Sequence, residues 1–355
     1  MKVNTYLAVR LFALGLCLAA AGGASAAAKE TVPQDKPAAK PAASPQPKVP
    51  EAEMKAAQAV QSAPDAQAAL TAAEAFVGKH GKSVLRPRMA RFIAEKIGEV
   101  KDPAQQIALA ESYNKIFNAP EESSVIRPYM IEAYIAAKRL DDAFPLATLD
   151  AVERFDDPVA TMINLSIIAA EQTQRSNPKF VQQGRQLGLK AIEMIEANRK
   201  PAVVGDAGWA IYKSKWLPQL YHSLGLLSFT TGDAADAKVK LAKARELNSV
   251  NPYTYVAIGV IANNEYQQLA QQHKAVAAGA ARDELLKSAQ AQMDQVIDAY
   301  ARAIALTDGQ AAYGPLRTQL MQDLEAYFKY RNNGSAEGMQ KLIDKYKKPV
   351  EPKLP

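Results

Sequence analysis

The chain has 355 residues, a formal net charge of +6 and a single cysteine. The charge is uneven: segments 1–26, 27–50 and 341–355 carry +2, +2 and +3, which leaves −1 for residues 51–340. A nearly neutral body argues against a nucleic-acid groove on the fold, so no nucleic acid is expected among the partners. Weak contact of the basic ends with anionic envelope polymers is a hypothesis.

Residues 1–26 have the layout of a secretory signal peptide. Lys2 and Arg10 precede an apolar run over 11–21, and Ala24-Ser25-Ala26 supplies a cleavage site of small residues. The run is much shorter than the roughly 20 residues needed to span a bilayer. We therefore expect cleavage after about Ala26, a periplasmic or secreted mature protein, and no transmembrane helix after removal of the signal.

The only cysteine, Cys17, lies inside this signal segment. Leu14-Gly15-Leu16 before it puts a bulky Leu where a lipoprotein signal needs a small residue, so we interpret lipidation through Cys17 as the lesser alternative. Removal of the segment leaves no cysteine for a disulfide, and stability must then come from packing.

Residues 27–50 are rich in Pro, Ala and Lys and contain almost nothing large and apolar to bury. This composition predicts a semi-rigid, extended linker. The linker is either a spacer that holds the body away from a membrane or wall, or an export-friendly leader with no further task. Residues 348–355 form a basic, Pro-containing tail.

Apolar residues in the body, 51–347, recur at three- and four-residue intervals, and no alternating strand pattern of useful length is present. This periodicity predicts an all-α fold of antiparallel helix pairs. Helices are predicted over 66–79, 87–99, 103–117, 127–138, 140–155, 158–174, 179–198, 208–230, 233–247, 252–278, 281–307, 315–331 and 335–347.

Three pairs of residues are separated by 34 positions: Tyr221 and Tyr255, Leu224 and Ile258, and Gly225 and Gly259. This spacing resembles that of tandem tetratricopeptide repeats (TPRs). The resemblance implies a right-handed α-solenoid, with its clearest repeats over 218–251 and 252–310. The first unit also matches the pattern of that family at Gly232, Ala237, Leu241, Ala244 and Leu247. Small residues in this pattern let two helices approach, large ones fill the gap between them, and Asp233 is placed to cap the second helix.

The second unit departs from the regular period. Its second-helix residues Val296, Tyr300, Ala303 and Leu306 follow their counterparts in the first unit by 59 positions, so about 25 residues are inserted. The insert, near Gln267 to Gln292, has a natural reversal at Ala277-Ala278-Gly279. We predict that both helices are prolonged by about 12 residues, which gives one elongated hairpin that projects on the order of 20 Å.

Upstream, Ala73 to Ser83 resembles repeat proteins of the bacterial envelope, which carry a Phe, a Tyr or His, and a Ser at similar spacing. Gly81 stands where those proteins usually have Pro. The strong similarity to tetratricopeptide repeats covers about a quarter of the chain, and the remainder is helical but off-consensus. Together with the export signal, it suggests a TPR protein of the envelope or secreted type. The Asn332 to Ser335 turn leads to a last helix that we expect to cap the stack.

Both tryptophans lie on one face of one helix, because Trp209, Tyr212 and Trp216 precede Leu220 and Leu224 at helical steps. An aromatic stripe of this kind is either a partner-binding anchor or part of an inter-helix seam. These three residues are the partner-binding candidates, and the core interpretation is the more common outcome for such spacing.

No motif supports catalysis or a cofactor. Ser112 and Lys115 have the S-x-x-K spacing of penicillin-recognising enzymes, but no companion motif or strand accompanies them. His80, His222 and His273 have no metal-ligand spacing. Acidic pairs such as Glu121-Glu122 are placed to cap helices. We therefore expect neither an enzyme nor a metal or cofactor site.

The leading hypothesis is an exported, non-catalytic scaffold that mediates protein–protein or protein–peptide interaction in the cell envelope. The alternative is a structural envelope protein that associates with wall or membrane polymers through its basic ends.

Overall fold

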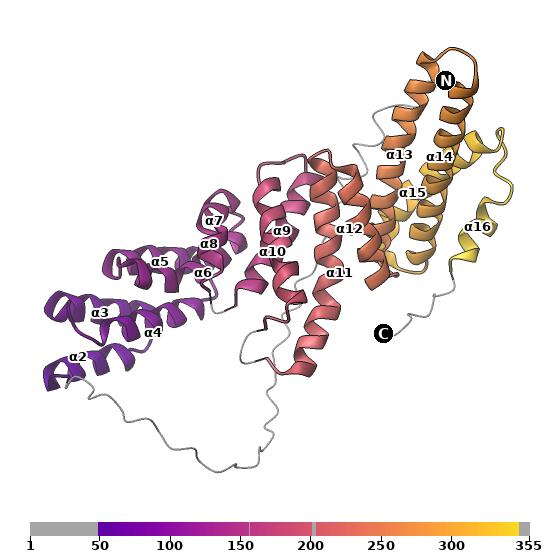
Figure 1. Ribbon diagram of the computed structural model, residues 1–355. Coiled ribbons are helices and arrows are strands. Elements are labelled where there is room, and N and C mark those ends of the chain that lie inside the picture. Colours follow the sequence, from indigo (N-terminus) through magenta and orange to yellow (C-terminus); the bar gives the residue numbers. More distant parts are fainter. Residues whose placement is uncertain (1–48, 156, 201–203, 348–355) are drawn as a thin grey trace, which may run out of the picture. The chain divides into compact units, whose positions relative to one another are not determined.

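The computed structural model describes residues 49–155, 157–200 and 204–347 (Figure 1). The segment 1–26 predicted as a signal peptide, nearly all of the predicted linker, and the tail 348–355 lie outside these residues. Fifteen α-helices and no strand occur in the described ranges, so the all-α prediction is confirmed. The right-handed sense of the stack stays a prediction. The helices form two compact units, one that ends at Phe155 and one that follows it.

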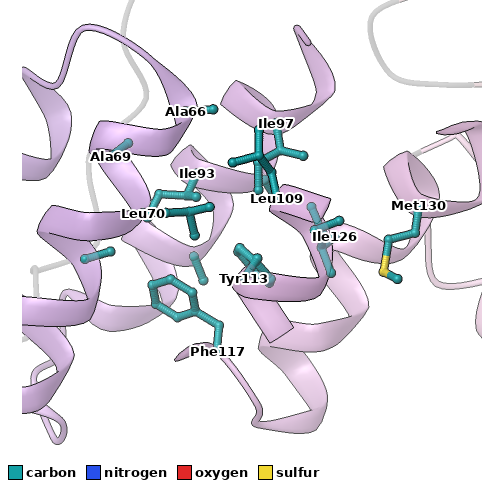
Figure 2. Close-up of a cluster of buried hydrophobic side chains, with 14 of the residues drawn as sticks. Ala66, Ala69, Leu70, Ile93, Ile97, Leu109, Tyr113, Phe117, Ile126 and Met130 are labelled. Atoms are coloured by element: carbon teal, nitrogen blue, oxygen red, sulfur yellow. The ribbon is translucent and has the colours of Figure 1, made fainter. Parts of the chain in front are cut away.

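The N-terminal unit contains seven helices, and consecutive helices among the first six pack against one another. Its helices are α2 (Glu51–Gln61), α3 (Ala66–His80), α4 (Arg86–Gly98), α5 (Pro103–Ile116), α6 (Pro120–Ala136), α7 (Leu140–Leu146) and α8 (Leu149–Val152). Figure 2 shows the core of this unit, where side chains from α3 to α6 converge. Leu70, Ile93, Tyr113 and Ile126 are each buried. Burial of such side chains on the apolar face of each helix holds the unit together.

Two predicted helices of this unit are corrected, and one helix is added. Helix α2 was not predicted, because its Ala-rich sequence buries only Ala57 and Val60. Helix α6 begins at Pro120 rather than at 127, and it keeps Pro128 in its interior. The helix predicted over 140–155 is two short helices, α7 and α8, because the chain leaves helical geometry at Ala147 and Thr148.

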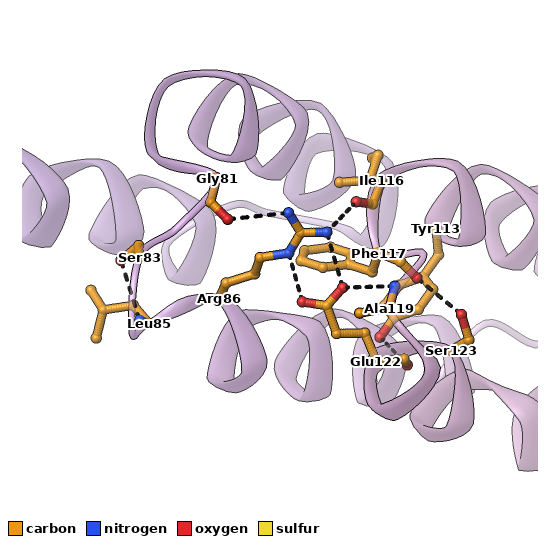
Figure 3. A network of polar contacts seen from close by, with 10 residues as sticks. All are labelled: Gly81, Ser83, Leu85, Arg86, Tyr113, Ile116, Phe117, Ala119, Glu122 and Ser123. Atoms are coloured by element: carbon orange, nitrogen blue, oxygen red, sulfur yellow. Dashed lines mark hydrogen bonds and ion pairs between the residues drawn. The ribbon is translucent and has the colours of Figure 1, made fainter.

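A polar network joins the α3–α4 turn to the start of α6 (Figure 3). Arg86 donates from Nε to Oε1 of Glu122 at 2.6 Å and from Nη2 to Oε2 at 3.0 Å. The same guanidinium donates to the carbonyls of Gly81 and Ile116. Tyr113 donates its hydroxyl to the Glu122 carbonyl at 2.9 Å. Since the Glu122 side chain is only 6% exposed, the network fixes α6 at its first turn.

The network explains where α6 starts. A proline inside a helix removes one hydrogen bond and costs about 3 kcal/mol, so sequence alone favours a start beside Pro128. Pro120 is equally acceptable at the first turn of a helix. The paired Glu122 lies in that first turn and its side chain also reaches the Ala119 amide, which completes the cap. Tertiary contacts therefore select the longer helix.

The C-terminal unit is a series of longer helices. They are α9 (Pro158–Gln174), α10 (Val181–Glu196), α11 (Asp206–Thr230), α12 (Ala234–Leu247), α13 (Pro252–Ala275), α14 (Ala280–Leu306), the 3₁₀ turn η2 (Ala311–Tyr313), α15 (Gly314–Arg331) and α16 (Met339–Lys345). Several of these helices begin with a side-chain cap, which accepts a hydrogen bond from a free backbone amide of the first turn. Gly232 makes the turn between α11 and α12 with a φ of +84°, and Asp233 then accepts a hydrogen bond from the Asp236 amide. The predicted turn and the predicted cap of α12 are thus both confirmed. Asp157 and Asn251 cap α9 and α13 in the same way.

The elongated hairpin is confirmed. Helices α13 and α14 have 24 and 27 residues, against 14 for α12, and the chain reverses at Val276–Gly279. Gly279 has a φ of +149°, a backbone conformation that glycine adopts readily and residues with a Cβ atom rarely do. The helix predicted to end at 278 ends at Ala275, and the last helix, predicted from 335, begins at Met339.

Candidate partner-binding site

The two repeat-like helix pairs share one contact. In the first pair, a Cβ built on Gly225 would lie 2.7 Å from Leu241 Cγ. In the second, a Cβ on Gly259 would lie 2.4 Å from Tyr300 Cε1. The glycines differ by 34 positions and the large residues by 59, so both pairs use the same position to let the helices approach.

Most other residues of the repeat pattern lie in the interior of these pairs, but Leu247 at the end of α12 is 41% exposed. Ala237, Ala244 and Ala303 are at most 1% exposed, and Tyr300 is equally buried. Tyr221 and Tyr255 are buried along their rings and donate their hydroxyls outward, to Glu196 Oε1 at 2.8 Å and to the Ser249 carbonyl at 3.1 Å. Each therefore satisfies its polar atom at the edge of the core.

Replacement of Gly259 by Ala tests this close approach. The new methyl group would overlap the buried Tyr300 ring, so we expect the free energy of unfolding to fall by about 1–3 kcal/mol. Gly78 of α3 is the matched control, because nothing lies within 4 Å of its Cβ position. There, Ala should stabilise by up to about 1 kcal/mol through helix propensity. Urea unfolding of the whole chain measures both; a stabilising Gly259→Ala would refute the contact.

The position of Leu224 in the repeat pattern differs in burial between the pairs, and a groove results. Leu224 is fully buried, because the glycine at 188 lets α10 come within van der Waals contact of it. Its counterpart Ile258 is only half-buried. Ile258 instead lines a cavity of about 200 Å³ between α12, α13 and α14. We call this cavity the α12–α13 groove.

The α12–α13 groove has an apolar floor and a basic rim. Leu241, Ile261 and Ala262 form the floor and are at most 3% exposed. Lys238 and Arg245 of α12 stand at the rim. The Lys238 ammonium pairs with Glu265 Oε1 of α13 at 2.5 Å. Within the described part of the chain, the exposed Arg245 guanidinium makes no ion pair or side-chain hydrogen bond.

The hairpin continues outward from the groove. Between residues 264 and 292, Ala289 is the only buried residue. The distal part is therefore held by contact of its two helices and by few polar contacts, such as Arg282 Nε donating to His273 at 3.3 Å. Leu286 is 42% exposed. This half of the hairpin thus buries little of the rest of the fold.

The aromatic stripe runs from the core toward the surface. Trp209 is 2% exposed and donates Nε1–H to Asn198 Oδ1 at 2.8 Å. Tyr212 stacks on Trp209 at 5.1 Å between ring centroids, and Trp216 follows at 6.3 Å. Trp216 is half-buried and has Lys215 Nζ 4.7 Å above its ring. Trp209 is therefore a core residue, whereas the half-buried Tyr212 and Trp216 offer surface to a partner.

The remaining motifs lie apart from one another. Ser112 donates its hydroxyl to the Ala108 carbonyl of its own helix, and Tyr113 beside it is in the core. His80 packs on Phe76, and His222 is buried with Nδ1 3.3 Å from Thr254 Oγ1. No group of three or more His, Cys, Asp or Glu side chains that could hold a metal is found among the described residues.

Neither the α12–α13 groove nor the Arg86–Glu122 pair was predicted from the sequence.

Searches against protein-family models, curated protein sequences and solved structures find no match to this chain. Over the ranges that the structure describes, no helix is both long enough and apolar enough to cross a membrane.

Proposed function

We propose that this chain is an exported, non-catalytic scaffold of the tetratricopeptide-repeat type that holds a protein or peptide partner in the cell envelope, with the hairpin α13–α14 as a contact element. One observation carries the proposal. Two successive helix pairs share the glycine contact of Gly225 and Gly259, and the second pair is then extended by a stretch in which Ala289 alone is buried. Repeat scaffolds of stacked helix pairs commonly bind partners on the surfaces they expose.

The energetics favour a binding role for the hairpin over a structural one. A two-helix projection gains little apolar burial from its own fold, and each ordered residue costs on the order of 1 kcal/mol in conformational entropy. Its apolar side chains, such as Leu286, remain available to a partner.

Removal of the hairpin tests the proposal. Gly259 of α13 faces Tyr300 of α14. The two helices are antiparallel, so Tyr266 and Met293, each seven residues closer to the tip of the hairpin, lie at the same level along it. A chain without Gln267 to Gln292, closed by a short Gly-containing turn, should therefore keep the base of the pair. We expect crosslinked capture from an envelope extract, with protein beginning at Ala27, to recover a partner with the full chain and lose it with the shortened one.

The outcomes separate the candidate functions. Equal recovery by both chains would remove the hairpin from the contact surface. Recovery of no partner by the full chain would contradict the scaffold proposal itself. Capture that disappears above about 0.3 M salt, and that needs the linker or the tail, would favour the alternative of a structural protein bound to envelope polymers. Unchanged tryptophan fluorescence, which reports on α11, confirms that the shortened chain is folded.

A further inference from the structure

The α12–α13 groove has the size of a single side chain. Its volume of about 200 Å³ lies below the roughly 300–1,000 Å³ of sites for small organic ligands. It is close to the apolar cavity of about 150 Å³ that accepts one benzene molecule. One Phe or Leu side chain therefore fits, and a cofactor does not.

The charges at the rim of the groove determine which partner residue can lie next to that side chain. Four basic residues lie on α12, and two of them are engaged within the helix: Lys240 with Asp236 and Lys243 with Glu246. Lys238 is held by Glu265 across the rim. Arg245 is the remaining cation at the groove, and Gln295 of α14 completes the rim without charge. A guanidinium in this position attracts a carboxylate and repels another cation.

We propose that the α12–α13 groove is the docking surface for a partner segment that carries one large apolar side chain beside a carboxylate. The apolar group enters over Leu241 and Ile261, where it displaces water from a floor that has no polar side chain. The carboxylate pairs with Arg245 at the rim. This inference rests on the proposed scaffold function and names the chemistry of its partner.

Synthetic peptides test the chemistry without knowledge of the natural partner. One short peptide has a central Phe flanked by Glu; a second has Lys in place of Glu; a third has Ala in place of Phe. Fluorescence anisotropy with the full chain should rank the first tightest, with each of the others weaker by about tenfold or more. Equal affinity for all three peptides would overturn the proposal.

Variants locate the binding. Ala242 is exposed and lines the groove, so Ala242→Met should fill it and weaken the acidic Phe peptide by about tenfold or more. Ala235, equally exposed on α12 but outside the groove, is the control for Ala→Met. Arg245→Gln should remove the preference for the Glu peptide over the Lys peptide. Arg199, which is also exposed but distant in sequence, is the control, and Arg199→Gln should leave that preference unchanged. Binding unchanged by Ala242→Met would overturn the assignment.

Two results keep the inference separate from the proposed function. If the natural partner is captured equally by wild type and by Ala242→Met, the scaffold function stands and the groove is not its docking surface. If no partner is captured at all, the scaffold function fails, whatever the peptides do.

Discussion

Replacement of Arg86 by Met should lower the stability of the N-terminal unit by about 3–5 kcal/mol. The methionine fills a similar volume, but it leaves the Glu122 carboxylate, whose side chain is only 6% exposed, without its bidentate partner. The carbonyls of Gly81 and Ile116 lose their guanidinium donor as well. An unpaired buried charge costs far more than the ion pair contributes on its own.

Two optical signals can separate this effect from changes elsewhere. Both tryptophans of the chain, Trp209 and Trp216, belong to the C-terminal unit. Urea unfolding followed by tryptophan fluorescence should therefore be unchanged by Arg86→Met, whereas far-UV circular dichroism should show an earlier transition for part of the helical signal.

Two further variants control the interpretation. Lys96 pairs with Glu99 at 3.4 Å on the surface, and Lys96→Met should cost less than about 1 kcal/mol. Replacement of both buried partners, as Arg86→Met with Glu122→Leu, should recover much of the loss because no buried charge then remains. A loss for Arg86→Met no larger than that for Lys96→Met would show that the network does not hold α6.

The stability of the C-terminal unit should fall as the pH drops below the ordinary pKa of histidine, because of His222. Burial lowers the pKa of His222 to about 4 from its usual 6.5. In the unfolded chain the imidazole takes a proton below pH 6.5, whereas in the folded chain it stays neutral until about pH 4. The contribution of the neutral His222 is therefore fully present above pH 6.5 and is lost between pH 6.5 and 4.

The expected loss is on the order of 2 kcal/mol at pH 5 and roughly 3 kcal/mol at pH 4, from 1.36 kcal/mol per pKa unit. His222→Gln has no titrating group at this position. The difference in urea midpoint between variant and wild type therefore isolates the effect of His222 from that of the other titrating side chains. Tryptophan fluorescence is the readout. A difference that stays constant from pH 7.5 to pH 4 would contradict the burial argument.

Features that depend on local signals can be predicted from the sequence of this chain. Apolar periodicity, Pro at first turns and Asp233 at a cap are read within a few residues, so the all-α class and most helices could be predicted. The 34- and 59-residue spacings likewise predicted the elongated α13–α14 hairpin, because an insertion within a periodic pattern can only lengthen the helices or interrupt them.

Features that depend on partners distant in sequence emerge when the folded chain brings those partners together. Arg86 and Glu122 are 36 positions apart, and their pairing selects the start of α6 at Pro120. Leu224 and Ile258 occupy the same position of the repeat pattern, but only Leu224 is fully buried. Gly188 of α10 packs against Leu224, whereas α12 leaves a groove beside Ile258. Helical periodicity says which face of a helix is apolar, but the packing of its neighbours decides whether that face becomes core or groove.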